Sequence, residues 1–113
     1  MAHPPAGIPG FELDALWDEF HQTVNMTARE LASWLLSTAA HETDGEEVSR
    51  HTGRHVLRIL RKRRSELTAE DVDVMYVVVD TVTAQRRAQV PAGGREQWRS
   101  RLMCLGHDPV RQL

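Results

Sequence analysis

The hydrophobic residues of this 113-residue chain recur every three or four positions in five successive stretches, the spacing of amphipathic helices. Residues 11–24 form the first stretch, whose apolar face consists of Leu13, Leu16, Trp17, Phe20 and Val24. A second stretch begins at Thr27 and carries Leu31, Trp34 and Leu35 on its apolar face. Both patterns predict helices that bury one side against a core.

The start of the second helix is marked by a capping box. Thr27 and Glu30 stand three residues apart, so each side chain can accept a hydrogen bond from a backbone N–H group that the first turn leaves unpaired. Met26 precedes the cap, at the position of a hydrophobic staple. The segment Asn25–Thr27 therefore predicts a tight connection between two helices.

A third helix is predicted for residues 47–67. At about 100° per residue, one of its sides collects Val56, Leu57, Ile59, Leu60 and Leu67. The opposite side collects Arg50, Arg54, Arg58, Arg61 and Lys62. Gly53 weakens the helix locally, which predicts either a kink or a place where another helix passes close.

Thr68 predicts the start of a fourth helix, because Glu70 and Asp71 suit the positive end of a helix dipole. The β-branched run Val77–Val79 would also allow a strand. A continuous helical stripe favours the helix, and it consists of Val72, Met75, Tyr76, Val79, Val82 and Thr83. Because Val74, Val77 and Val78 lie off that stripe, we expect this helix to be central in the fold or covered by a second copy of the chain.

A last helix is predicted for residues 95–105, ending at Gly106 and stopped by Asp108-Pro109. His107, beside this end, is expected to hydrogen-bond back to the core. Residues 1–10 contain three prolines and predict a flexible segment. The whole pattern predicts an all-α, compact single domain of about five helices over residues 11–113.

Charge is distributed unevenly along the chain, although the net charge is only −2. Residues 1–47 hold nine acidic residues and one basic residue, a net of −8. Residues 48–64 hold seven basic residues and no acidic one, a net of +7, and residues 65–113 have a net of −1. Such asymmetry indicates a charged partner, or one part of the protein lying against another.

The basic segment predicts binding to DNA, mainly through phosphates. Arginine suits this role because its planar guanidinium pairs with phosphate oxygens through two hydrogen bonds. Few Asn or Gln side chains and no aromatic ones accompany the basic residues, so we expect little reading of base edges. The candidate DNA-binding residues are Arg50, Arg54, Arg58, Arg61, Lys62, Arg63 and Arg64, flanked by His51 and His55.

Two other interpretations of the basic segment stay open. The acidic N-terminal helices can neutralise it within the fold. Alternatively, the chain is a homodimeric interaction module whose basic helix meets an acidic protein surface, with the apolar fourth helix as the dimer face.

Signals for a metal, a cofactor or catalysis are weak. His51 and His55 stand four residues apart, and Cys104 with His107 forms a Cys-x-x-His pair, which are ligand types that zinc accepts. A Cys-x-x-Cys pair is missing, and no nucleophile with an activating base or glycine-rich phosphate loop is recognisable. We therefore expect a non-enzymatic protein without a cofactor, a metal or a small-molecule substrate.

The N-terminal residues lack the basic start and apolar run of a signal peptide, and no stretch approaches the roughly 18 apolar residues of a membrane span. The single cysteine, Cys104, allows no internal disulfide. These features predict a cytoplasmic protein with no membrane association.

Three blocks of sequence are similar to a known family. They are Asp18–Thr27 continuing to Glu30-Leu31 and Trp34-Leu35, Gly53-Arg54 with Ile59–Lys62, and Trp98-Arg99 with Leu102-Met103 and Gly106–Pro109. From about Phe11 to Val110 the chain resembles the bacterial domain of unknown function 3140 family. Members of that family are often labelled DNA-binding proteins, so the resemblance implies DNA binding but no particular site residues.

Overall fold

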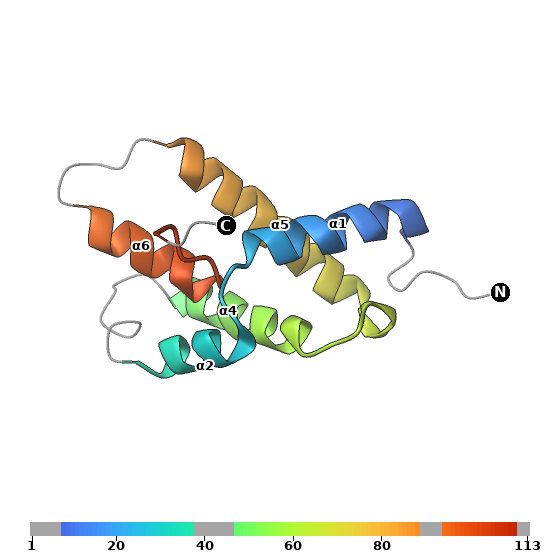
Figure 1. The fold of residues 1–113 in the computed structure, drawn as a ribbon, viewed down its shortest axis with the longest axis horizontal. Helices are drawn as coiled ribbons and strands as arrows, with labels where there is room; N and C mark the ends of the chain where they lie inside the picture. The colour runs from blue at the N-terminus through green and yellow to red at the C-terminus, as the bar shows by residue number, and fades with distance from the viewer. Residues whose placement is uncertain (1–7, 38–46, 89–93, 111–113) are drawn as a thin grey trace.

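The computed structural model describes residues 8–37, 47–88 and 94–110, and over this part of the chain the protein is a single all-α domain (Figure 1). Its α-helices are α1 (Gly10–Thr23), α2 (Ala28–Leu36), α4 (Glu47–Leu60), α5 (Ala69–Arg87) and α6 (Arg95–Cys104), with a short 3₁₀ helix, η2 (Arg64–Glu66). Ile8, just before α1, is half-buried against the core. None of the helices in the described ranges has the length and apolar character that crossing a membrane requires.

The helices form two groups that meet between α4 and α5. In one group α2, α4 and α6 pack on one another, and in the other α1 crosses α5 (Figure 1). The largest fully buried side chains come from every α-helix and are Phe20, Leu31, Val56, Ile59, Met75, Val78, Val82, Leu102 and Cys104. One continuous core therefore joins both groups.

Capping boxes begin two of the helices. At α2 the Thr27 hydroxyl accepts from the Glu30 amide (3.1 Å), while the Glu30 carboxylate accepts from the Thr27 amide (2.8 Å), as the sequence predicts. At α5, Thr68 and Asp71 exchange the same two bonds, at 3.1 and 2.9 Å. The second box begins α5, and Val77–Val79 lies inside this helix and not in a strand.

The buried face of α5 differs in part from the predicted stripe. Val72, Met75, Val79 and Val82 are buried as expected, but Val78, which the pattern placed off the stripe, is fully buried. Val77 is 54% exposed. Of the two predicted explanations for so many valines, the central position is correct, because α5 packs against both α1 and α4.

Gly53 lies where α4 meets the end of α6. A Cβ atom added at this position would collide with the backbone carbonyl oxygen of Cys104. The glycine therefore allows a close approach of two helices, the second of the two predicted roles, and a larger residue here would force the helices apart.

The third predicted helix is too long, because α4 ends at Leu60 and not at Leu67. The chain tightens there through bonds from the Arg61 amide to the Arg58 carbonyl (3.2 Å) and from the Lys62 amide to the Ile59 carbonyl (2.9 Å). The Arg63 amide then donates to the Glu66 carboxylate (2.8 Å), which begins η2. The helix thus ends without a glycine or proline, because a side chain and short turn bonds satisfy the backbone amides that a longer helix would have paired.

The end of α6 returns the chain to the turn between α1 and α2. Gly106 adopts a left-handed conformation with φ of 89°, as a residue after a helix often does. Asn25 then holds Asp108 by two bonds, donating to its carbonyl (3.0 Å) and accepting from its amide (2.8 Å). His107, as expected, bonds back to the core, with Nδ1 donating to the Thr23 carbonyl (2.6 Å).

Candidate functional site

The outer side of α4 carries a strip of basic side chains. Among the α4 side chains that the structure describes, residues 50–60, the exposed ones are His51, Arg54 and Arg58, which we call the α4 strip. Gly53 and Val56 are buried on the inner side of the helix. Amphipathic burial thus concentrates positive charge in a narrow line along the helix.

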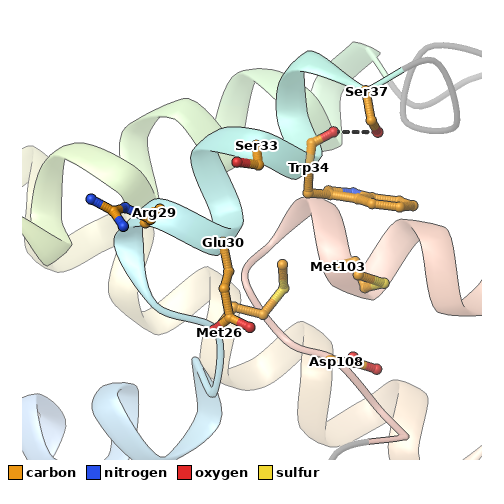
Figure 2. Close-up of a pocket in the computed structure, with 8 residues that line it drawn as sticks. All are labelled: Met26, Arg29, Glu30, Ser33, Trp34, Ser37, Met103 and Asp108. Carbon is orange, nitrogen blue, oxygen red and sulfur yellow. Dashed lines mark hydrogen bonds between the residues drawn. The ribbon is translucent and has the colours of Figure 1, made fainter.

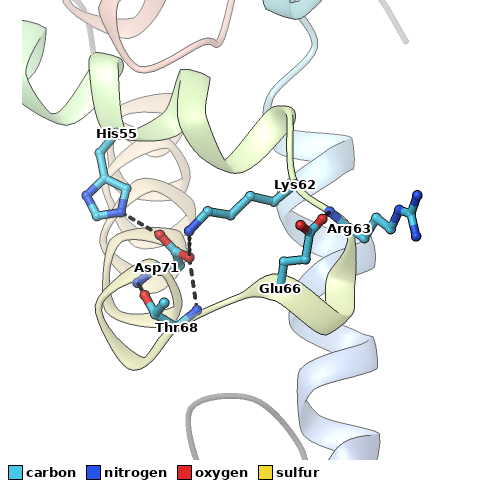
Figure 3. Close-up of polar contacts among 6 residues, drawn as sticks. All are labelled: His55, Lys62, Arg63, Glu66, Thr68 and Asp71. Carbon is cyan, nitrogen blue, oxygen red and sulfur yellow. Dashed lines mark hydrogen bonds and ion pairs between the residues drawn. The ribbon is translucent and has the colours of Figure 1, made fainter.

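Two more arginines follow where α4 ends. Arg61 and Arg63, the turn arginines, are exposed, and Figure 3 shows Arg63 extending away from the neighbouring polar side chains. Within the described part of the chain, no ion pair engages Arg58, Arg61 or Arg63. Guanidinium groups in this position can meet an anion without first leaving a carboxylate.

Three of the predicted DNA-binding residues are paired with a carboxylate or partly buried, unlike the exposed arginines of the α4 strip. The Lys62 ammonium donates to the Asp71 carboxylate (2.6 Å), and its side chain is only 30% exposed. Arg64 forms an ion pair with Asp14 of α1. Arg50 is half-buried. Lys62 and Arg64 therefore hold helices together, and the acidic first helix meets the basic segment at Asp14, in line with the predicted internal neutralisation.

A buried polar cluster lies between α4 and the start of α5 (Figure 3). The carboxylate of Asp71, which is 2% exposed, bonds to His55 Nε2 (2.7 Å), to Lys62 and to the Thr68 amide. Burial alone would raise the pKa of Asp71, but the bonds from Lys62, Thr68 and His55 outweigh it and hold this pKa well below its ordinary value. The ionised carboxylate therefore joins the end of α4 to the start of α5.

The predicted zinc-type residues have other roles in the fold. His51 is exposed on the α4 strip, whereas His55 is buried against Asp71. Cys104 is fully buried, and His107 is bonded to Thr23. Across residues 8–37, 47–88 and 94–110, no group of three or more histidine, cysteine or acidic side chains is arranged to hold a metal ion.

Acidic residues gather on α1 and on the neighbouring face of α5. The Tyr76 hydroxyl of α5 donates to the Glu12 carboxylate of α1 (2.6 Å). This hydrogen bond, followed by burial and by the charges of Glu12, Asp80 and Glu19, raises the pKa of Tyr76. The molecule thus carries its positive strip on α4 and an acidic surface on α1 and α5.

A cavity of about 550 Å³ lies between α2 and α6 (Figure 2). It is bordered by the turn that contains Met26 and by the segment after α6 that contains Asp108. Its lining consists of Met26, Arg29, Glu30, Ser33, Trp34, Ser37, Met103 and Asp108. The sequence gives no sign of this cavity, because only the fold brings residues 26–37 next to residues 103–108. The i, i+4 spacing of Glu30, Trp34 and the neighbouring serines gave no signal distinct from an ordinary helix face.

Comparison with known proteins places the chain in a family without assigning it an activity. A family model described as "Protein of unknown function (DUF3140)" matches residues 19–103, about three quarters of the chain. This range includes α2, α4 and α5 but stops before the Gly106–Pro109 block. No curated protein and no solved structure matches the chain significantly.

Proposed function

The chain belongs to the family of proteins of unknown function DUF3140, and we propose that it is a small, non-enzymatic protein that binds double-stranded DNA through phosphate contacts. The observation that carries this proposal is the α4 strip: every exposed side chain on the described part of α4 is an arginine or a histidine. The DNA-contacting residues are Arg54, Arg58, Arg61 and Arg63, with His51 at the flank.

The geometry suits one strand of a phosphate backbone. Arg54 and Arg58 are about 6 Å apart along the helix axis, and the exposed turn arginines follow directly after the end of the helix. A guanidinium pairs with phosphate through a two-pronged hydrogen bond, so each arginine adds both charge and orientation. With no aromatic side chain on this side of α4, the surface favours a duplex over unpaired bases, which need stacking partners.

The number of contacts sets the expected salt dependence. Four arginine–phosphate contacts predict that log K falls with log salt concentration at a slope of about −3.6, at roughly 0.9 per contact. Lys62 and Arg64 are left out, because each already holds an internal carboxylate. The proposal therefore predicts a shallower slope than the seven basic residues of the segment would produce.

The test is fluorescence anisotropy of a labelled duplex of about 30 base pairs, roughly three helical turns, at several salt concentrations. Arg58→Glu/Arg61→Glu should weaken binding at least tenfold and reduce the slope by about two. The matched control is Arg86→Glu/Arg87→Glu, which makes the same charge change on exposed residues at the far end of α5 (Figure 1).

Equal losses in the two variants would mean that only net charge matters and would overturn the assignment of the strip. Absence of binding even at low salt would overturn the function itself. The basic strip would then be a surface for an acidic protein partner, which is the alternative that the sequence leaves open.

A further inference from the structure

A serine with an exposed side chain follows directly after the basic residues at the end of α4. Ser65 lies in η2, and the four residues before it are Arg61, Lys62, Arg63 and Arg64. No side chain of η2 is buried, and within the described part of the chain the Ser65 hydroxyl has no hydrogen-bond partner. This hydroxyl is therefore accessible to solvent beside the turn arginines.

The other serines whose side chains the structure describes have different surroundings. The Ser37 hydroxyl donates to the Trp34 carbonyl (2.6 Å), and Ser100 is half-buried. Ser33 is exposed on α2, but the four residues before it include one basic and one acidic side chain. Ser65 is thus distinguished by the basic run before it, and Ser33 is a matched comparison.

A phosphate group on Ser65 would lie close to cations that no carboxylate holds. Lys62 and Arg64 are paired with Asp71 and Asp14, whereas no ion pair engages Arg61 or Arg63 in the described ranges. Two residues of chain span at most about 7 Å, so Arg63 is within the Debye length of about 8 Å at physiological salt. Arginine pairs with phosphate through two hydrogen bonds, which makes the turn arginines suitable partners.

We propose that Ser65 is a phosphorylation site whose phosphate occupies the turn arginines and weakens the binding of DNA. This effect rests on the function proposed above. The phosphate carries a charge of about −1.5 to −2, which nearly cancels the charge of Arg61 and Arg63 and repels the phosphates of the duplex. About two of the four arginine–phosphate contacts, those of Arg54 and Arg58, then remain.

The modifying enzyme would be a serine kinase with an acidic substrate groove, acting with ATP and Mg²⁺. The Ser65 Oγ forms a bond to the γ-phosphorus of ATP while the bond from that phosphorus to the β–γ bridging oxygen breaks. ADP leaves, and the hydroxyl proton passes to a carboxylate of the kinase. Acidic side chains in the groove complement the four basic residues before Ser65, which selects this serine over Ser33.

The segment around Ser65 can enter such a groove at small cost. The Glu66 amide donates to the Arg63 carbonyl (2.9 Å), and the Leu67 amide donates to the Arg64 carbonyl (3.3 Å). The Arg63 amide donates to the Glu66 carboxylate (2.8 Å). Since η2 buries no side chain, its local opening breaks a few exposed hydrogen bonds and leaves the core intact.

The first experiment tests the site alone. The full chain is incubated with Mg²⁺, ATP and a serine kinase that requires arginine shortly before its target, and mass spectrometry locates the phosphate. We expect phosphate on Ser65, none on Ser33, and loss of the modification in Ser65→Ala. An unmodified Ser65, in a reaction that phosphorylates a basic control peptide, would overturn the site.

The second experiment measures the effect on DNA, with phosphoserine incorporated during synthesis at position 65 or at position 33. Phosphate on Ser65 should lower the affinity for the duplex at least about tenfold and change the salt slope from about −3.6 to about −1.8. Phosphate on Ser33 makes the same change in net charge and should keep the affinity within about twofold. Equal losses would overturn the effect of Ser65 on the turn arginines.

Failure of this inference can be distinguished from failure of the DNA-binding proposal. If the unmodified chain binds no DNA, the proposed function is wrong, but the mass spectrometry still tests the site. Phosphate on Ser65 should also shift the Nε–Hε nuclear magnetic resonance signal of Arg63, while phosphate on Ser33 leaves it in place. An unchanged Arg63 signal would show that the phosphate does not pair with this turn arginine and would overturn the mechanism.

Discussion

Two junctions hold the helices of this protein together, and they do so with opposite chemistry. The terminal junction, where Gly106–Asp108 meets the turn between α1 and α2, consists of hydrogen bonds from Asn25, Met26 and His107 to backbone carbonyls, with the exposed Arg99–Asp108 pair at its edge. The α4–α5 junction consists of the buried Asp71 carboxylate with Lys62 and His55. The second should respond to acid, because it depends on an ionised carboxylate.

This difference explains why a strongly basic segment serves two purposes. Buried charges are tolerated only when they are paired. Lys62 therefore serves as the partner of the buried Asp71 and is not an exposed cation like the arginines beside it. Arg58 and Arg61 remain on the surface. The same run of positive residues thus contains structural cations and cations available to a partner.

Removal of the Asp71 carboxylate should have the largest effect on stability. Asp71→Ala should lower the free energy of unfolding by about 3 kcal/mol, because α5 loses its cap and Lys62 and His55 lose their buried partner. Urea unfolding followed by circular dichroism measures this loss. Asp73→Ala, an exposed change on the same helix, should stay within about 0.5 kcal/mol of the unmodified protein, and similar losses in both would contradict the junction's role.

The terminal junction can be broken through Gly106. Gly106→Ala should lower the free energy of unfolding by about 2 kcal/mol, because φ is 89° and the new Cβ would lie 2.8 Å from Cγ1 of Val24. Gly10→Ala is the matched control, since its Cβ would meet nothing within 4 Å. A loss no larger than that of Gly10→Ala would show that the left-handed turn at Gly106 does not stabilise this junction.

Acid should weaken the α4–α5 junction selectively. The folded pKa of Asp71 is lowered, so its contribution to stability is complete above the unfolded value of about 3.9 and is lost as pH falls towards the folded value. We expect this one group to account for a loss of roughly 1–2 kcal/mol between about pH 4 and pH 2.

Asp71→Asn should be less stable at neutral pH and should show a shallower decline in acid, whereas Asp18→Asn, an exposed change, should follow the unmodified protein. Unfolding curves at pH values from 2 to 6 give the comparison. Parallel declines in all three proteins would show that other carboxylates cause the acid sensitivity.

Local patterns in the sequence were sufficient for most of the fold but not for the junctions. Capping residues and apolar spacing predict both ends of α1 and α6 to within one residue and the starts of α2 and α5, because those signals act within a few positions. The predicted end of α4 was wrong, because the true end depends on the bond from Lys62 to Asp71 and on the bond from the Arg63 amide to Glu66. Nothing in the helical period distinguishes Lys62 from the arginines beside it.

The candidate DNA-binding surface was predictable where it depends on helical spacing and not where it depends on contacts between distant residues. Helical periodicity places Arg54 and Arg58 on the side opposite the core, and both are exposed. The pairing of Arg64 with Asp14 joins residues fifty positions apart, which no local pattern encodes. The cavity beside α2 likewise depends on α6 packing against α2, so it could be found only in three dimensions.

The smallest expected effects separate the two kinds of cation most sharply. Lys62→Met should lower the free energy of unfolding by about 1 kcal/mol, since Asp71 loses a partly exposed partner, and should leave the salt slope of DNA binding unchanged. Arg58→Met should do the reverse, keeping stability within about 0.5 kcal/mol while the slope falls by about one. Both substitutions remove one positive charge, so net charge cannot explain a difference between them. If the two variants lose DNA affinity equally, Lys62 does not differ from Arg58 in its effect on DNA binding, and the division between structural and surface cations is wrong.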